Sequence, residues 1–251
     1  MTADLLDLLD RARRASGHAA TSGGVVRETS PDGRACRIVY AHCAADEVAG
    51  VVRDEVARAE ANGYVLEWKL YGHDGPPGLA DSLLAAGFRP DDPESVLVLP
   101  LTAATLAAFD APAYERRRVD DAADVAEISR EIGRGDVEEE RRRLTAALRA
   151  APDELSIHVA YVDGEPVACG RIHFPRDSDL AELAGGRTKT THRRQGFFTA
   201  LVAARLREAA ARNRTHVSVD ALPTSEPLLR RRGFRLVTGT RPYVYTPTPL
   251  A

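Results

Sequence analysis

The sequence predicts a mixed α/β fold built from two halves, and three observations support this fold class. In the second half, strand-like segments alternate with segments of helical periodicity. The pair Asp163-Gly164 lies between two apolar runs and is typical of a hairpin turn, because these residues adopt positive φ at low cost. The alanine, proline and threonine content of residues 101–112 interrupts the strand pattern on both sides. This segment is therefore predicted to join the halves.

The second half is predicted to run strand, two helices, three strands, helix, strand, short helix and two strands. In its longest helix, Leu201, Ala204, Leu206 and Ala209 recur at helical spacing, with arginine and glutamate on the other face. The short helix at residues 225–232 ends at a glycine that is followed by an aromatic strand residue. The other predicted elements are strands at residues 115–119, 156–162, 166–174, 180–188 and 216–220, and helices at residues 122–132 and 137–150.

The first half repeats part of this pattern. Leu83 precedes the pair Gly87-Phe88 by four residues, as Leu229 precedes Gly233-Phe234, and a strand-like run lies before each. We therefore expect two domains, the first a degenerate version of the second. An unrelated α/β domain that shares one helix-end pattern is the alternative for the first half. The predicted domains are residues 1–106 and 107–251.

Composition and charge exclude several classes of protein. A chain of 251 residues with a formal charge of −3 does not fit a general nucleic-acid binder, and its arginine clusters lie beside acidic or helical segments as solvated faces. No run of eighteen apolar residues occurs, and the first residues are unlike a signal peptide, so we expect a cytoplasmic protein without membrane contact. The arginine and alanine bias is similar to that of a high-GC bacterial genome.

Cysteine usage points to no special chemistry. Cys36, Cys43 and Cys169 form an odd set without CxxC spacing. Neither a disulfide framework nor a zinc site is indicated. We expect reduced cysteines that serve packing, and no metal site.

Residues 187–198, RTKTTHRRQGFF, read as an extended segment that passes through a basic, glycine-containing turn into a helix. N–H groups at a helix start are unpaired, and the helix dipole favours an anion there. The spacing fits neither a P-loop, which needs GxxxxGK and then Ser or Thr, nor a GxGxxG fingerprint. The turn therefore predicts a phosphate site, with an ordinary strand-to-helix connection bearing solvated arginines as the alternative.

The run from Arg193 to Gly196 resembles the first four positions of R/QxxGxG/A, the signature that begins a helix in the GNAT superfamily of acyl-CoA N-acyltransferases. The LLxxxGF-type ending at Leu228, Leu229, Gly233 and Phe234 is similar to the last helix and following strand of that family. The resemblance runs from Tyr114 to the C-terminus. It implies the GNAT fold, a mixed and mostly antiparallel sheet flanked by helices, with a degenerate GNAT-like N-terminal half.

In the family, main-chain amides of the turn hold the pyrophosphate of acetyl-CoA, and the preceding strand offers main-chain groups to the pantetheine arm. Phe198 departs from the signature, since it stands where glycine or alanine is usual. The cofactor-binding residues that the resemblance implies are Thr188, Lys189, Thr190, Arg193, Arg194, Gln195, Gly196, Phe197 and Phe198.

Glu182 is the candidate general base. It lies eleven residues before Arg193, at the same offset as the glutamate base of GNAT histone acetyltransferases, and strand alternation would place it on one face with Ala184 and Gly186. A carboxylate partly buried in such a cleft suits proton removal near neutral pH. A solvent-facing glutamate is the alternative. The rivals for this role are His158, His173 and His192, which have no orienting partner that the sequence identifies.

The usual general acid of the family is missing. Leu229 stands where many GNAT enzymes have tyrosine, and Leu222 stands where asparagine is frequent. Ser225, a water or another tyrosine would then protonate the leaving thiolate, unless it leaves without a proton. Ser225 also fits the N-cap of the short helix.

Two aspartates are candidates for holding a cationic acceptor. Asp136 lies in the loop between the first two helices, which in the family forms one wall of the acceptor pocket, and Asp220 ends the strand after the signature helix. Asp136 fits better as the N-cap of the second helix, with Glu139 completing a capping box.

Together these observations predict an acetyl-CoA-dependent N-acetyltransferase that acts on an amine of a small molecule or peptide. A catalytically silent acyl-CoA-binding or regulatory module is the first alternative. An anion-binding structural domain without CoA preference is the second. The sequence leaves the oligomeric state open, a homodimer included.

Overall fold

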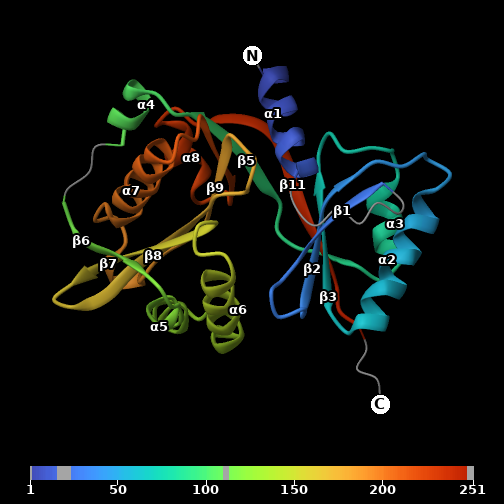
Figure 1. The fold of residues 1–251 in the computed structure, drawn as a ribbon, viewed down its shortest axis with the longest axis horizontal. Helices are drawn as coiled ribbons and strands as arrows, with labels where there is room; N and C mark the ends of the chain where they lie inside the picture. Colours follow the sequence, from blue (N-terminus) through green and yellow to red (C-terminus); the bar gives the residue numbers. More distant parts are fainter. Residues whose placement is uncertain (1, 16–23, 110–112, 248–251) are drawn as a thin grey trace. The chain divides into compact units, whose positions relative to one another are not determined.

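The computed structural model of the chain describes residues 2–15, 24–109 and 113–247 (Figure 1). The helices are α1 Thr2–Ala15, α2 Val48–Asn62, α3 Leu79–Ala85, α4 Ala103–Ala107, α5 Ala123–Glu131, α6 Val137–Ala150, α7 Phe197–Ala211 and α8 Glu226–Arg230, with a 3-10 turn η1 at Thr190–His192. The strands are β1 Val25–Thr29, β2 Ala35–Ala41, β3 Val65–Tyr71, β4 Arg89–Pro90, β5 Glu94–Pro100, β6 Glu115–Val119, β7 Leu155–Val162, β8 Glu165–His173, β9 Leu180–Thr188, β10 His216–Ala221 and β11 Arg235–Tyr245. The predicted mixed α/β fold class is confirmed.

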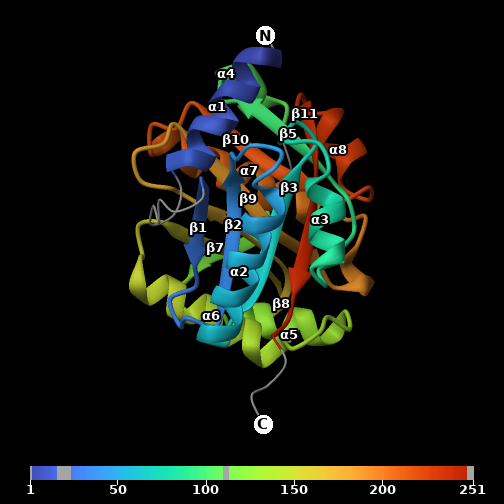
Figure 2. The same ribbon diagram turned by 90° about the vertical axis from the view of Figure 1, so that its right-hand side faces the viewer.

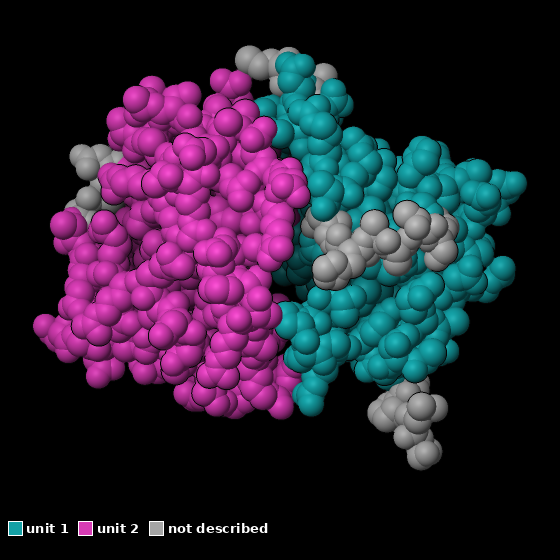
Figure 3. Space-filling model, viewed as in Figure 1, with its two compact units in different colours: residues 1–96, 221–224, 237–251 teal, residues 97–220, 225–236 magenta. Residues whose placement is uncertain are grey.

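The chain forms two compact units, coloured separately in Figure 3. Unit 1 comprises residues 1–96, 221–224 and 237–251, and unit 2 comprises residues 97–220 and 225–236. Each unit thus takes residues from both predicted halves of the sequence. The predicted junction at residues 101–112 contains the short helix α4, and its residues 110–112 lie outside the described residues.

In unit 1 the strands follow the order β1-β2-β3-β11, and β4 pairs with β11. Helices α2 and α3 lie over these strands (Figure 2) and share a core with them that includes Ile38, Val52, Trp68 and Leu83. The two final strands expected from the sequence are a single long strand, because residues 240–245 of β11 pair continuously with β3.

In unit 2 the strands β6, β7, β8 and β9 pair antiparallel in sequence order, and β10 pairs in parallel with β9. The turn between β7 and β8 has the predicted positive φ at Asp163 and Gly164. Helices α5 and α6 share one core with the sheet, around Ile128, Leu144 and Ile157. Helix α7 packs against the sheet through a separate core that contains Phe197 and Leu201.

Helix α7 is more deeply buried than its sequence suggests. Ten of its fifteen residues are buried, and among them is Arg205, which the periodicity placed on a solvent face. The guanidinium donates hydrogen bonds to the carbonyl oxygens of Leu201, Arg171 and Ala184. Gly170 makes room for it, since a Cβ there would lie 2.6 Å from Arg205 Cζ. The predicted solvent exposure of Arg205 is therefore wrong, because carbonyl groups replace water around the charge.

Strand β9 contains a β-bulge. Its register with β8 shifts by one between Cys169 and Arg171, so that Gly185 and Gly186 stand opposite Gly170. Gly185 has φ +59, and a Cβ there would lie 2.5 Å from Arg171 Nη1. Only glycine fits this position, and a bulge bends the strand that carries it.

Strands β9 and β10 separate after a short parallel ladder. They pair over four residues, from Leu180 with His216 to Leu183 with Val219, although β9 continues to Thr188. The main-chain groups of β9 beyond Leu183 are therefore not paired with β10. Such a strand edge can pair with an extended ligand.

Unit 1 repeats this succession of pairings. Residues 35–38 of β2 pair in parallel with residues 65–68 of β3, and the register of β2 with β1 shifts by one between Val26 and Arg27. A hairpin with a bulge followed by a four-residue parallel ladder thus occurs in both units. The similarity between the two halves, which the helix-end pattern suggested, is therefore also found in the pairing of their strands.

Glu208 on α7 is held by a polar cluster. Its carboxylate accepts hydrogen bonds from His158 and Ser156 at 2.7 and 2.8 Å and pairs with Arg212 at 2.7 Å. Burial disfavours the charged carboxyl, but these hydrogen bonds and positive charges outweigh it and lower the pKa of Glu208 to about 2. A depressed pKa contributes stability above the ordinary carboxyl pKa of about 4.3 that is lost as the pH falls towards 2.

We therefore expect Glu208→Gln to lower the free energy of unfolding near pH 7, with a difference from wild type that shrinks between about pH 5 and pH 2. Urea unfolding followed by circular dichroism at several pH values measures this difference. A loss of stability that is the same at all these pH values would show that the carboxylate charge is not the cause.

Candidate functional site

The predicted anion-binding turn connects β9 to α7. After η1, Arg193 is extended, Arg194 has φ +62, and Gly196 has φ +97 immediately before the first residue of α7. Within the described parts of the chain, the main-chain N–H groups of residues 194–197 have no acceptor. Consecutive unpaired N–H groups at a helix start form an anion-binding concavity. The turn therefore has the donors that a phosphate needs.

The side chains around the turn form no hydrogen bonds with the main-chain N–H groups of residues 194–197. Gln195 Nε2 donates to the carbonyl oxygen of Thr191 at 3.1 Å, and the Arg193 Nε lies 3.4 Å from the carbonyl oxygen of Thr188. Arg193 and Arg194 are both exposed. Their guanidinium groups add positive charge to the region of the unpaired amides, which favours an anionic ligand.

The two phenylalanines of the turn have different surroundings. Phe197 is buried, and its ring centroid lies 4.2 Å from that of Tyr114. The Phe198 ring lies against Gly186 of β9, where a Cβ would be 3.1 Å from Phe198 Cε2. The absence of a side chain at Gly186 thus accommodates the bulky residue that replaces the small one of the signature.

The side chain of Lys189, one of the predicted cofactor-binding residues, forms ion pairs with α5. Its ammonium lies 2.8 Å from Glu127 and 3.2 Å from Glu131 of α5, and its N–H donates to Val167. Lys189 therefore ties the end of β9 to α5. Thr188 remains on the strand edge beside the turn, half-buried, and Thr190 is exposed.

Glu182 and Asp220 share one face of the sheet. Glu182 pairs with Ser218 of β10, and Asp220 lies two residues further along that strand. Side chains two apart on a strand, and those directly paired, point to the same face. Glu182 is partly buried, and no side chain of the described residues forms a hydrogen bond or ion pair with its carboxylate. The structure thus brings both carboxylates to the place where β9 and β10 separate.

The bulge corrects one expectation about this face. Strand alternation predicted that Glu182, Ala184 and Gly186 share a face, but the extra residue at Gly185 turns Gly186 to the side of α7, against Phe198. Glu182 and Ala184 remain together, because the alternation is intact up to the bulge.

The other candidate residues have mixed outcomes. Asp136 caps α6, as preferred, by accepting the N–H of Glu139 at 2.9 Å. Ser225 precedes α8, yet its side chain makes no capping hydrogen bond to that helix. His158 is engaged by Glu208, and His173 lies directly opposite Glu182 on β8.

The equivalent turn of unit 1 differs in charge and hydrogen bonding. It runs from β2 to α2, and the N–H of Ala44 donates to the carboxylate of Glu47 at 3.0 Å. Asp46 and Glu47 give it two negative charges where the turn of unit 2 has two arginines. This acidic turn does not suit an anionic ligand, which agrees with the lack of a cofactor signature in the first half.

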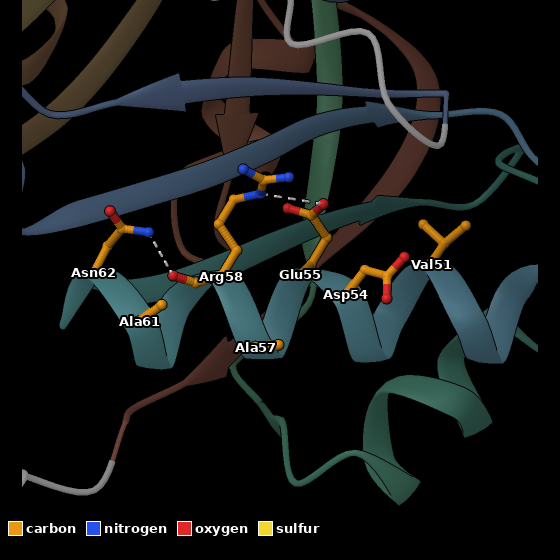
Figure 4. A pocket seen from close by; sticks show the side chains of 7 residues that line it. All are labelled: Val51, Asp54, Glu55, Ala57, Arg58, Ala61 and Asn62. Atoms are coloured by element: carbon orange, nitrogen blue, oxygen red, sulfur yellow. Dashed lines mark hydrogen bonds and ion pairs between the residues drawn. The ribbon is translucent and has the colours of Figure 1, made fainter.

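A pocket in unit 1 shares no residue with this site (Figure 4). All its lining residues belong to α2, and the carboxylate of Glu55 is held by Arg27 of β1 at 2.7 Å and lies 3.8 Å from Arg58. Among the described residues, no group of His, Cys, Asp and Glu could hold a metal ion. None of the described helices combines the length and the apolar character that a membrane span requires.

A central helix that begins at an anion-binding turn, after a bulged strand that separates from its parallel neighbour, is the arrangement that the comparisons with known proteins address. Residues 122–234 match the model of the Acetyltransferase (GNAT) family. The recognition from the signature residues is thereby confirmed.

Solved structures extend the similarity to the whole chain at the level of fold. A functionally unknown conserved protein from Staphylococcus epidermidis ATCC 12228 has a TM-score of 0.67 at 13% identity, covering 93% of this chain and 96% of its own. A GCN5-related N-acetyltransferase from Kribbella flavida has a TM-score of 0.64 at 17% identity, and the match covers 100% of this chain and 96% of the other. A tandem GNAT protein from the clavulanic acid biosynthesis pathway has a TM-score of 0.61 at 15% identity, and the match covers 100% of this chain and 96% of the other.

These similarities show that the N-terminal half is also GNAT-like in structure. The predicted GNAT-like fold of the first half is thus confirmed. No curated protein sequence matches the chain.

Proposed function

We propose that the chain is an acetyl-CoA-dependent N-acetyltransferase that transfers an acyl group to an amine of a small molecule or peptide by direct attack. The observation that carries this proposal is the set of unpaired main-chain N–H groups at residues 194–197, at the start of a helix and beside Arg193 and Arg194. A diphosphate is the ligand that such a turn suits. The family whose model residues 122–234 match generally uses acetyl-CoA.

The part of β9 that does not pair with β10 can position the thioester end of acetyl-CoA. With the diphosphate at the turn, an extended arm can run along β9 back towards Leu183, where the ladder with β10 ends. Main-chain groups of the strand would pair with its amides, as an added strand does. Such positioning alone supplies a large part of the rate enhancement, because it makes the attack effectively unimolecular.

The chemistry then requires a proton acceptor near the end of the ladder. The amine nitrogen attacks the thioester carbonyl carbon, a C–N bond forms, and the C–S bond breaks as CoA leaves. Glu182 accepts the proton that the amine loses, and Asp220 on the same face attracts a cationic acceptor. Ser225 is the candidate donor of a proton to the thiolate. Asp136 contributes less to acceptor binding, since its carboxylate already caps α6.

Glu182→Gln is expected to lower turnover by about a hundredfold or more, because the amide cannot accept the proton. The affinity for CoA should not change, since Glu182 makes no contact with the turn. Thiol release from acetyl-CoA with a panel of polyamines, amino acids and aminoglycosides measures turnover, and calorimetry measures CoA affinity. Glu165→Gln, an exposed glutamate at the start of β8, is the matched control. Full turnover in Glu182→Gln would exclude Glu182 as the base.

One observation favours a second candidate function, a catalytically silent acyl-CoA-binding or regulatory module. Leu229, at the position where many GNAT enzymes have tyrosine, is 1% exposed and offers no hydroxyl to a leaving thiolate. Such a module would bind CoA without turnover on any amine. Binding is visible as a rise in melting temperature, since ligand at a hundred times its Kd adds about 2.7 kcal/mol of stability.

A further inference from the structure

Tyr114, just before β6, is joined to the signature turn by two contacts. Its hydroxyl donates a hydrogen bond to the carbonyl oxygen of Gln195, which is 81 residues away in the sequence. Its ring packs on Phe197 with an interplanar angle of 37°. Tyr114 thus contacts the residues on both sides of Gly196, and neither the sequence signature nor the spacing of the site residues predicts these contacts.

The geometry of the peptide bond gives the hydrogen bond a directional effect. The carbonyl of Gln195 and the N–H of Gly196 belong to one planar peptide unit, which is trans in this structure. In a trans peptide the C=O and N–H bonds point in opposite directions. When Tyr114 holds the carbonyl oxygen, the N–H of Gly196 is therefore directed away from Tyr114, into the concavity at the start of α7.

Glycine makes this constraint necessary. Gly196 has φ +97 and ψ −6, and a residue without Cβ can leave this conformation easily. If the Gln195–Gly196 peptide rotates, its N–H no longer points into the concavity. The ligand must then fix the peptide when it binds, and the free energy needed to order it weakens the affinity. The side chain of Gln195 does not hold this peptide, because its amide donates to the carbonyl of Thr191 instead.

We propose that Tyr114 is a positioning residue for the diphosphate site, which orients the Gln195–Gly196 peptide so that the N–H of Gly196 faces the ligand. This inference rests on the proposed function. Tyr114 contributes to CoA affinity and does not take part in the chemistry, because it lies at the turn and not at the separation of β9 from β10.

The test is Tyr114→Phe, which keeps the ring against Phe197 and removes only the hydroxyl. We expect CoA, titrated by calorimetry, to bind about fivefold more weakly, the effect of one hydrogen bond. The melting temperature without ligand should match that of wild type, and the amide resonance of Gly196 should shift in the ligand-free spectrum. Tyr161→Phe is the matched control, since its hydroxyl donates to Asp124 of α5 and not to the turn. It should leave CoA affinity unchanged.

The outcomes separate this inference from the proposed function. If wild type binds CoA and Tyr114→Phe binds it equally well, the positioning role is wrong and the proposed function stands. If affinity and ligand-free melting temperature fall together, Tyr114 has only a structural role, and the inference is again wrong. If wild type does not bind CoA, the proposed function fails and the inference fails with it.

Discussion

Replacing Gly196 by aspartate is expected to weaken CoA binding by about a hundredfold or more, since like-charge contact costs several kcal/mol. Gly196 has φ +97, which a residue with a side chain adopts only under strain. The new carboxylate would lie beside the N–H groups of residues 194–197 and accept their hydrogen bonds. Calorimetric titration with CoA at fixed ionic strength measures the loss, because salt screens the repulsion.

Two further variants separate charge from backbone strain. Gly33→Asp places the same residue at φ +71 in the β1–β2 hairpin, where a Cβ meets nothing within 4 Å, and should leave CoA affinity unchanged. Gly196→Ala introduces strain without charge and should cause a smaller loss than Gly196→Asp. Wild-type affinity in Gly196→Asp would show that the diphosphate does not bind at the start of α7, and the proposed function would lose its main support.

Most elements of unit 2 can be predicted from the sequence because their signals are local. The hairpin at Asp163-Gly164 depends on two residues that accept positive φ, and both have it. The start of α6 depends on Asp136, whose carboxylate caps the helix within three residues. The turn before α7 is recognisable because Gly196 and its two arginines are neighbours in the chain.

The parts that could not be predicted depend on contacts between distant residues. Arg205 has the sequence pattern of a surface arginine, and its burial depends on the missing side chain at Gly170 and on carbonyl groups of other strands. The hydrogen bond from Tyr114 to Gln195 has no counterpart in local sequence. The composition of the units is also nonlocal, since residues 237–251 at the end of the chain belong to unit 1.

Neutralising Glu140 by Glu140→Gln is expected to lower the free energy of unfolding by about 3 kcal/mol. Glu140 on α6 forms two hydrogen-bonded contacts with Arg187 of β9, one of them at 2.7 Å, and lies 3.8 Å from Arg171 of β8. The Arg187 side chain is 9% exposed and that of Glu140 is 15% exposed. Removing the carboxylate charge leaves a buried guanidinium without its anionic partner, which costs far more than the loss of a surface pair. Because Arg171 and Arg187 flank the bulge, the variant should also disturb β9.

The pH dependence of this loss identifies its cause. Burial disfavours the charged carboxyl, but hydrogen bonds and attraction from Arg187, with a further contribution from Arg171, outweigh it and hold the pKa of Glu140 below its ordinary value. The stabilisation is then present above the ordinary carboxyl pKa and disappears as the pH falls through the lowered one. Urea unfolding of Glu140→Gln should therefore differ from wild type most near pH 7 and least in acid. Glu138→Gln, on the same helix but 54% exposed and paired with the exposed Arg130 and Arg141, should cost less than about 1 kcal/mol. Equal losses in the two variants would mean that the Glu140 cluster is no stronger than a surface ion pair and does not hold the bulged strand.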